Sequence, residues 1–206
     1  EISFSMVLRV VGLRPTPSPT PIVTPTPAPE PSDDELVLVR DYIPGIFIDL
    51  KYATTDNFTG QVIYDSDEAY LRYGTVKKLL AAQNELSGRG LSLKIWDAYR
   101  PVSAQFKLWE ICPNPVYVSD PNNGYSKHSR ANTVDITLVT STGESIPMPS
   151  GFDDFTSLAD RDYSDVSAEA AENARLLESI MVENGFVPCS GEWWHYSDSV
   201  SYDVYE

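Results

Sequence analysis

A run of eight prolines in 17 residues, PTPSPTPIVTPTPAPEP at Pro15–Pro31, most constrains how this chain folds. Proline lacks a backbone N–H and has a fixed φ, so the run can form neither a helix interior nor a central strand. Such Thr/Pro-rich segments are extended and semi-rigid. We therefore predict a linker over residues 15–32 and one folded domain over residues 33–206. A disordered tail with no tethering role is the alternative.

The segment before the linker, residues 1–14, is apolar but is interrupted by Arg9. A membrane-spanning helix needs about 20 apolar residues, so this segment is too short to be one. We interpret it as the remnant of an export signal or anchor, or as an extra strand. Together with the linker, the first interpretation predicts an extracytoplasmic protein, secreted or tethered to the cell surface, whose folded domain does not insert into the membrane.

The net charge of −15 disfavours nucleic acid and anionic membrane surfaces as partners, because both would repel the chain. Solubility alone is a sufficient reason for such acidity. Cys112 and Cys189 allow one disulfide or two free thiols, and they lack the close spacing of structural zinc sites.

Hydrophobic periodicity predicts long helices over residues 69–90 and 167–185, and a short helix over 103–111. Ser167 is placed to cap the second long helix, and Gly88 and Gly185 to end the two long ones. Alternating or β-branched runs predict strands over 91–100, 133–139, 185–189 and 192–197. Helices mixed with such strands favour a single α+β domain with a central antiparallel sheet flanked by helices. The oligomeric state does not follow from these patterns.

Both histidines of the chain lie near acids in strand-like segments. Asp135 follows His128 by seven residues and falls inside a β-branched run, where an acid is costly to bury without a partner. A metal ion would be such a partner, and His128, Asp135 and His195 together would suit catalytic zinc with a fourth position open. A structural histidine and a solvent-facing acid are the simpler alternatives.

Glu192 precedes His195 by three residues in GEWWHYSD. In a regular strand this spacing points the two side chains to opposite faces, unless the turn at Gly191 bends the backbone. If both reach one metal ion, Glu192 suits a general base better than a fourth ligand, because a closed site cannot hydrolyse a substrate. Trp193 and Trp194 would then wall the site and exclude water.

The motifs around the two histidines resemble those of the zinc D-alanyl-D-alanine dipeptidases of the vancomycin-resistance type. The family pattern S-x-H-x-x-G-x-A-x-D is similar to SKHSRANTVD at residues 126–135, and E-x-W-H is similar to EWWH at 192–195. KYATTDNFTG from Lys51, WDAYRP from Trp96 and GFDDF from Gly151 are similar to stretches of the dipeptidase branch. Ala131 and Thr133 stand where the family has glycine and alanine, and Ala131 has less freedom at positive φ.

This resemblance implies zinc-dependent hydrolysis of the dipeptide D-Ala-D-Ala to free D-alanine, with one Zn²⁺ per chain. It places the zinc ligands on His128, Asp135 and His195. It places the general base on Glu192 and the oxyanion-stabilising group on Arg100. The implied substrate contacts are Tyr52, Ser126 and Asp153, the last as a carboxylate for the substrate ammonium.

The same residues allow other interpretations. Arg100 could pair with Asp97 on the surface, Tyr52 could be a packed aromatic residue, and Asp153 and Asp154 could be turn residues. Two other functions stay open: a D,D- or L,D-carboxypeptidase that trims peptidoglycan stem peptides, and an inactive cell-wall-binding module. The dipeptidase-type stretches disfavour the first, and the presence of both a base and an arginine disfavours the second.

Overall fold

The computed structural model describes residues 29–205, and the chain from Pro31 onward forms one compact unit. The predicted signal remnant or strand at residues 1–14, and nearly all of the predicted linker, lie outside the described residues. Within residues 29–205, no helix is both long enough and apolar enough to cross a membrane.

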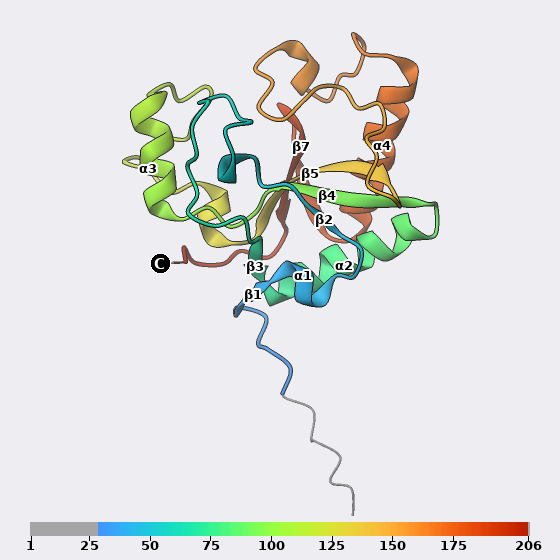
Figure 1. Cartoon of the computed structure of the whole chain (residues 1–206), viewed down its shortest axis with the longest axis horizontal. Helices are drawn as coiled ribbons and strands as arrows, with labels where there is room; N and C mark the ends of the chain where they lie inside the picture. Colours follow the sequence, from blue (N-terminus) through green and yellow to red (C-terminus); the bar gives the residue numbers. More distant parts are fainter. Residues whose placement is uncertain (1–28, 206) are drawn as a thin grey trace, which may run out of the picture. The chain divides into compact units, whose positions relative to one another are not determined.

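Helices and strands alternate irregularly along the described chain, which confirms the predicted α+β class (Figure 1). The helices are α1 (Val39–Tyr42), α2 (Tyr73–Ser87), α3 (Val102–Ile111) and α4 (Ala168–Glu183). Short 3₁₀ helices are η1 (Lys51–Ala53), η2 (Lys127–Arg130) and η3 (Ser157–Ala159). The strands are β1 (Leu36–Leu38), β2 (Phe47–Ile48), β3 (Tyr70–Arg72), β4 (Leu91–Asp97), β5 (Thr133–Thr140), β6 (Phe186–Cys189) and β7 (Glu192–Asp198).

The two long helices form where the periodicity predicts them, with shifted ends. Helix α2 begins at Tyr73 and not at residue 69, because residues 70–72 pair with β1 as β3. The hydroxyl of Ser167 accepts a hydrogen bond from Ala170 N at 3.2 Å, so it caps α4 as expected. The chain leaves α4 through Gly185 at φ +86°, a conformation that glycine adopts without steric cost.

A five-stranded sheet in the order β2-β4-β5-β7-β6 forms the centre of the domain. Strands β4, β5, β7 and β6 are antiparallel neighbours, as predicted. The two-residue strand β2, which the sequence did not indicate, runs parallel to β4 at the sheet edge and makes the sheet mixed. Strands β1 and β3 form a separate antiparallel pair.

A bulge in β4 determines which side chains share a face of the sheet. The register runs from Ile95↔Ile136 to Asp97↔Asp135, so Trp96 is an extra residue on β4. Residues directly opposite each other in an antiparallel pair point to the same face. Asp97 therefore shares a face with Asp135, and Asp135 shares it with His195, its partner on β7.

The other face of the sheet is apolar and carries the core. It includes Leu93, Ile95, Val134, Ile136 and Leu138, each at most 1% exposed. Helix α2 packs on β4, and α4 packs on β5, β6 and β7 (Figure 1). The opposite face, which carries Asp97, Asp135 and His195, is thus left to the loops and short 3₁₀ helices that connect the strands.

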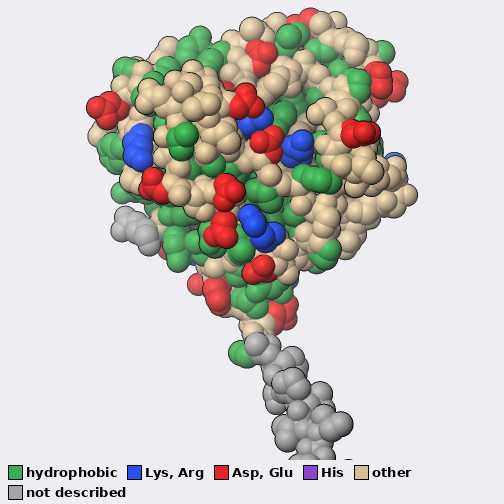
Figure 2. Space-filling view, in the orientation of Figure 1, with side chains coloured by type: hydrophobic (Ala, Val, Ile, Leu, Met, Phe, Trp, Pro, Cys, Tyr) green, Lys and Arg blue, Asp and Glu red, His purple; other side chains and the backbone are tan. Residues whose placement is uncertain are grey.

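The surface carries the acidic excess of the chain. On the face drawn in Figure 2, acidic side chains are scattered among fewer lysines and arginines over the whole outline of the domain. The net charge of −15 is therefore not confined to a single acidic cluster on that face.

Candidate active site

The three predicted metal ligands meet on one face of the sheet, although they come from η2, β5 and β7. One ligand atom each of His128, Asp135 and His195 lies within 4.8 Å of the other two. His128 Nε2 is 3.3 Å from Asp135 Oδ2, and His195 Nδ1 is 2.9 Å from Asp135 Oδ1. Ligand atoms about 2.0–2.2 Å from a tetrahedral zinc ion lie about 3.3 Å from one another, so this spacing fits such an ion.

The backbone around His128 orients its ring for metal binding. Nδ1 lies 2.8 Å from Ala98 O, so we assign the ring proton to Nδ1 and the free lone pair to Nε2, which faces Asp135. The Ser126 hydroxyl accepts from His128 N at 3.3 Å and caps η2. This hydrogen bond gives Ser126 a structural role, and its role as a substrate contact stays a prediction.

The turn from η2 into β5 uses the left-handed conformation, with Ala131 at φ +57°. This is the position where the family pattern has glycine. A residue with a Cβ adopts that conformation at a cost of roughly 1–2 kcal/mol, so the departure leaves the turn in place but strained. Thr133, the second departure, directs its hydroxyl to Ser197 Oγ at 3.1 Å.

Asp135 and His128 stabilise each other's charged forms, and His195 adds to the stabilisation of the Asp135 carboxylate. Burial alone would raise the pKa of Asp135, but the charges and hydrogen bonds of His128 and His195 outweigh it and hold that pKa well below its usual range. Burial opposes the protonated His128 ring, yet Asp135 and Asp97 raise its pKa. Two imidazoles and an ionised carboxylate are a donor set typical of catalytic zinc, so the residues present fit this metal.

A break in the β6–β7 register determines the position of Glu192. Pro188 pairs with Tyr196, whereas Cys189 pairs with Glu192, so residues 193–195 of β7 bulge out of the β6 register. The bulge brings Glu192 Oε2 to 3.3 Å from His195 Nδ1, although a regular strand would point these side chains apart. The Glu192 side chain is 44% exposed, and Glu192 lies outside the ligand cluster among the described residues. Burial raises the pKa of Glu192 against the opposing charge of His195.

Arg100 lies beside the site and is held by Asp97. Its Nη2 and Nε lie 2.6 and 3.1 Å from Asp97 Oδ2, and its Nη1 donates to Gln105 Oε1 at 2.8 Å. The pairing with Asp97 is therefore real, but it is buried and not at the surface, because the Arg100 side chain is 11% exposed and Asp97 0%. Three of the five guanidinium N–H groups have these partners.

Asp97, expected from the sequence only as a possible surface partner of Arg100, is a buried residue of the site. Its Oδ1 accepts from Tyr64 OH at 2.6 Å and from Ala98 N at 2.9 Å, and its Oδ2 lies 3.6 Å from His128 Nδ1. The carboxylate thus connects Arg100 to the ring of a predicted ligand. The sequence signal that could have identified Asp97 is an acid at the end of an apolar strand. Such an acid is costly to bury without a partner, and the same reasoning identified Asp135.

Tyr52 and Asp153, two of the predicted substrate contacts, contact each other. Tyr52 OH donates to Asp153 Oδ2 at 2.6 Å, and the guanidinium carbon of Arg100 lies 5.0 Å from the centre of the Tyr52 ring. Burial raises the pKa of Asp153 to about 7, although the hydrogen bond from Tyr52 lowers it. Asp153 has a positive φ of +51°, and the neighbouring Asp154 accepts from Thr156 N at 2.8 Å as a turn residue.

Aromatic side chains pack together beside Tyr52. Its ring lies 5.4 Å from that of Phe152, which in turn lies 5.9 Å from Trp96. The centre of the Trp193 ring lies 5.6 Å from that of Trp96 and 5.6 Å from that of Trp194. Trp193 and Trp194 are almost fully buried. Tyr52 is therefore a packed aromatic residue as well as a hydrogen-bond donor. That the tryptophans exclude water from the site stays a prediction.

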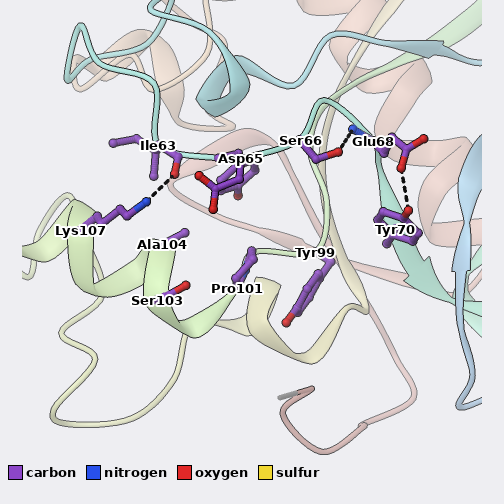
Figure 3. Close-up of a pocket in the computed structure, with 11 residues that line it drawn as sticks. Ile63, Asp65, Ser66, Glu68, Tyr70, Tyr99, Pro101, Ser103, Ala104 and Lys107 are labelled. Carbon is purple, nitrogen blue, oxygen red and sulfur yellow. Dashed lines mark hydrogen bonds between the residues drawn. The ribbon is translucent and has the colours of Figure 1, made fainter.

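A separate pocket of about 200 Å³ lies between the segment 63–70 and α3 (Figure 3). Lys107 donates to Ile63 O at 3.3 Å across one side of it, and Tyr70 donates to Glu68 at 2.7 Å on the other. None of the predicted site residues lines this pocket.

The two half-buried cysteines, Cys112 and Cys189, whose pairing the sequence left open, are free thiols.

Residues 32–203 match a family model described as D-ala-D-ala dipeptidase. The chain belongs to this family. Members are metallopeptidases and the family is zinc-dependent, so the predicted enzyme class is confirmed.

Relatives within the D-Ala-D-Ala dipeptidase family align over most of this chain. The D-alanyl-D-alanine dipeptidase of Escherichia coli K12 is 40% identical over 162 residues, which is 79% of this chain and 83% of that protein. The proteins of the same name from Enterococcus faecium and Streptomyces coelicolor are 35% and 36% identical, over 76% and 79% of this chain and 87% and 91% of their own lengths. The solved structure of VanYB in complex with D-Alanine-D-Alanine resembles this chain weakly. The TM-score is 0.43 and the sequence identity 16%, over 65% of this chain and 74% of that one.

Proposed function

We propose that this protein is a zinc-dependent dipeptidase that hydrolyses D-Ala-D-Ala to two molecules of D-alanine. The observation that carries the proposal is the position of Glu192, 3.3 Å from His195 but outside the cluster of His128, Asp135 and His195. A base beside an open metal position is the arrangement that hydrolysis needs. Membership of the D-Ala-D-Ala dipeptidase family supports the choice of substrate.

The residues have separable roles in this reaction. Zinc held by the three ligands would polarise the scissile carbonyl and acidify water. Glu192 accepts the proton of the attacking water and returns it to the leaving amine, and its raised pKa suits both transfers. Arg100 directs a guanidinium N–H group to the oxygen that gains negative charge, while Asp97 keeps the guanidinium in place.

Selectivity for a free dipeptide would come from Asp153. Its carboxylate would bind the substrate ammonium, and the short hydrogen bond from Tyr52 holds one carboxylate oxygen and orients the other. An acetylated amino end would lose this ion pair and add bulk. The half-buried carboxylate would then lack its partner, at a cost of up to about 3–5 kcal/mol, the value for a fully buried pair.

The decisive experiment incubates the zinc-loaded protein with D-Ala-D-Ala, with N-acetyl-D-Ala-D-Ala and with a muramyl pentapeptide, and measures D-alanine release and metal content. We expect one zinc per chain, less in His195→Ala, and turnover of the free dipeptide only. Equal cleavage of the acetylated dipeptide or the pentapeptide would instead indicate the carboxypeptidase. Bound zinc without turnover of any substrate would indicate the inactive wall-binding module.

We further propose that the enzyme acts outside the cytoplasm, secreted or tethered through the Pro/Thr-rich linker. The composition of residues 1–32 supports this location. Fractionation of cells that express the chain tests it, and enzyme found only in the cytoplasmic fraction would contradict it.

A further inference from the structure

The bulge that brings Glu192 to the site leaves backbone groups that the sheet does not pair. The pairing of β5 with β7 ends at Asp135↔His195. On the other side of β7, consecutive residues of β6 pair with Tyr196 and then with Glu192, so residues 193–195 have no partner on β6. Carbonyl groups in such a bulge need other donors, because an unpaired buried carbonyl is costly. The conformation of residues 192–195 therefore depends on what satisfies those carbonyls.

Arg161, from the loop between η3 and α4, supplies the donors. Its Nη2 lies 3.2 Å from Glu192 O and 3.3 Å from His195 O, and its Nε donates to Cys189 O at 2.7 Å. Its backbone N–H adds a bond to Ser190 O at 3.3 Å. One residue thus bonds both ends of the bulge and the turn that precedes it.

The Arg161 guanidinium is itself held by side chains of α4 and β7. Its Nη1 lies 3.0 Å from Glu178 Oε2 on α4 and 3.1 Å from Tyr196 OH, and its carbon lies 4.6 Å from the centre of the Tyr196 ring. The side chain is 11% exposed. Because side chains alternate along a strand, Tyr196 and His195 point to opposite faces of the sheet. Arg161 therefore acts on the backbone of β7 from the helix side, with its contacts on carbonyl oxygens and not on the ligand side chains.

We propose that Arg161 is a positioning residue for hydrolysis, whose guanidinium fixes the β7 bulge that holds the Glu192 carboxylate beside His195. The inference rests on the proposed function in that Glu192 is taken as the base. His195 is also held by its pairing with Asp135 on β5, whereas Glu192 pairs only with Cys189 at the strand end. Loss of Arg161 should therefore displace the base more than the metal ligand.

The test compares Arg161→Lys and Arg161→Ala with the wild-type chain for zinc content, kcat and KM on D-Ala-D-Ala. We expect zinc to remain near one per chain and KM nearly unchanged, while kcat falls by roughly 10- to 100-fold, the effect of a misplacement of about 1 Å. Methylguanidine should restore part of the kcat of Arg161→Ala. Arg175→Ala is the matched control, because Arg175 is exposed and its guanidinium lies over the Tyr163 ring, so kcat should not change.

Zinc-loaded Arg161→Ala with wild-type kcat would overturn the inference. A wild-type chain without turnover would instead overturn the proposed function. Crystal structures of the wild type and Arg161→Lys would then decide about Arg161, since an unmoved Glu192 carboxylate contradicts its role and a displaced one supports it. If both Arg161 variants fail to fold, the double variant Glu178→Gln, Tyr196→Phe loosens the guanidinium, and a kcat equal to that of the wild type would likewise refute the inference.

Discussion

Replacing Tyr52 by phenylalanine removes one hydrogen bond and leaves the packing of the ring unchanged. The hydroxyl lies 2.6 Å from Asp153 Oδ2, and the ring packs edge-on against Phe58 and Phe152. Phenylalanine keeps those ring contacts. The change therefore acts on the Asp153 carboxylate, which we expect to bind the ammonium of the substrate in its ionised form.

The size of the effect follows from the charge state of Asp153. Its pKa of about 7 leaves about half of the carboxylate ionised at pH 7. A hydrogen bond to a charged group contributes about 1.5–3 kcal/mol, and its loss raises the pKa further. The ionised fraction at pH 7 then falls to between about a tenth and a hundredth, so KM for D-Ala-D-Ala should rise about 5- to 50-fold.

The assay is KM for D-Ala-D-Ala from pH 6 to pH 9, expressed as the ratio of Tyr52→Phe to wild type, so that titration of the substrate amine cancels. Because the variant raises the pKa of an acid, the ratio should be largest at low pH and approach one as the pH rises. Tyr70→Phe is the control, since Tyr70 donates to Glu68 at 2.7 Å outside the site and its loss should not change KM. A Tyr52→Phe ratio that is independent of pH would refute the reasoning.

Three further predictions concern the site. Glu192→Gln should keep zinc and lose turnover, because a base is not a ligand; metal analysis that shows lost zinc would instead place Glu192 among the ligands. Arg100→Ala should keep zinc and lower kcat by roughly 10²–10³-fold as one oxyanion donor, with KM changed far less. Ala131→Gly should raise the free energy of unfolding in denaturant titration by up to about 1 kcal/mol, because relief of the left-handed strain exceeds the entropic cost of glycine; a loss of stability would contradict this.

Local patterns in the sequence were enough to predict the main elements. Apolar periodicity located α2 and α4, and β-branched or alternating runs located β4 to β7, because both signals depend on neighbours a few residues apart. The acid inside the β5 run pointed to a partner for Asp135, and the scarcity of histidine directed attention to His128 and His195. The resemblance to a known family then supplied roles that no spacing could.

Long-range pairing decided what local patterns could not. The bulge in β4 turns Asp97 to the face of Asp135, and the break between β6 and β7 brings Glu192 to His195 against the alternation of a regular strand. Each depends on how one strand registers against another, and Asp97 and Asp135 are 38 positions apart in the chain. Arg161 lies in a loop without a local motif, and only folding brings its guanidinium to the carbonyls of the bulge. The sequence by itself therefore determined the identity of the candidate ligands and the strands that carry Asp135 and His195. The tertiary structure decided which side chains face one another, because register is a property of paired strands and not of any one segment.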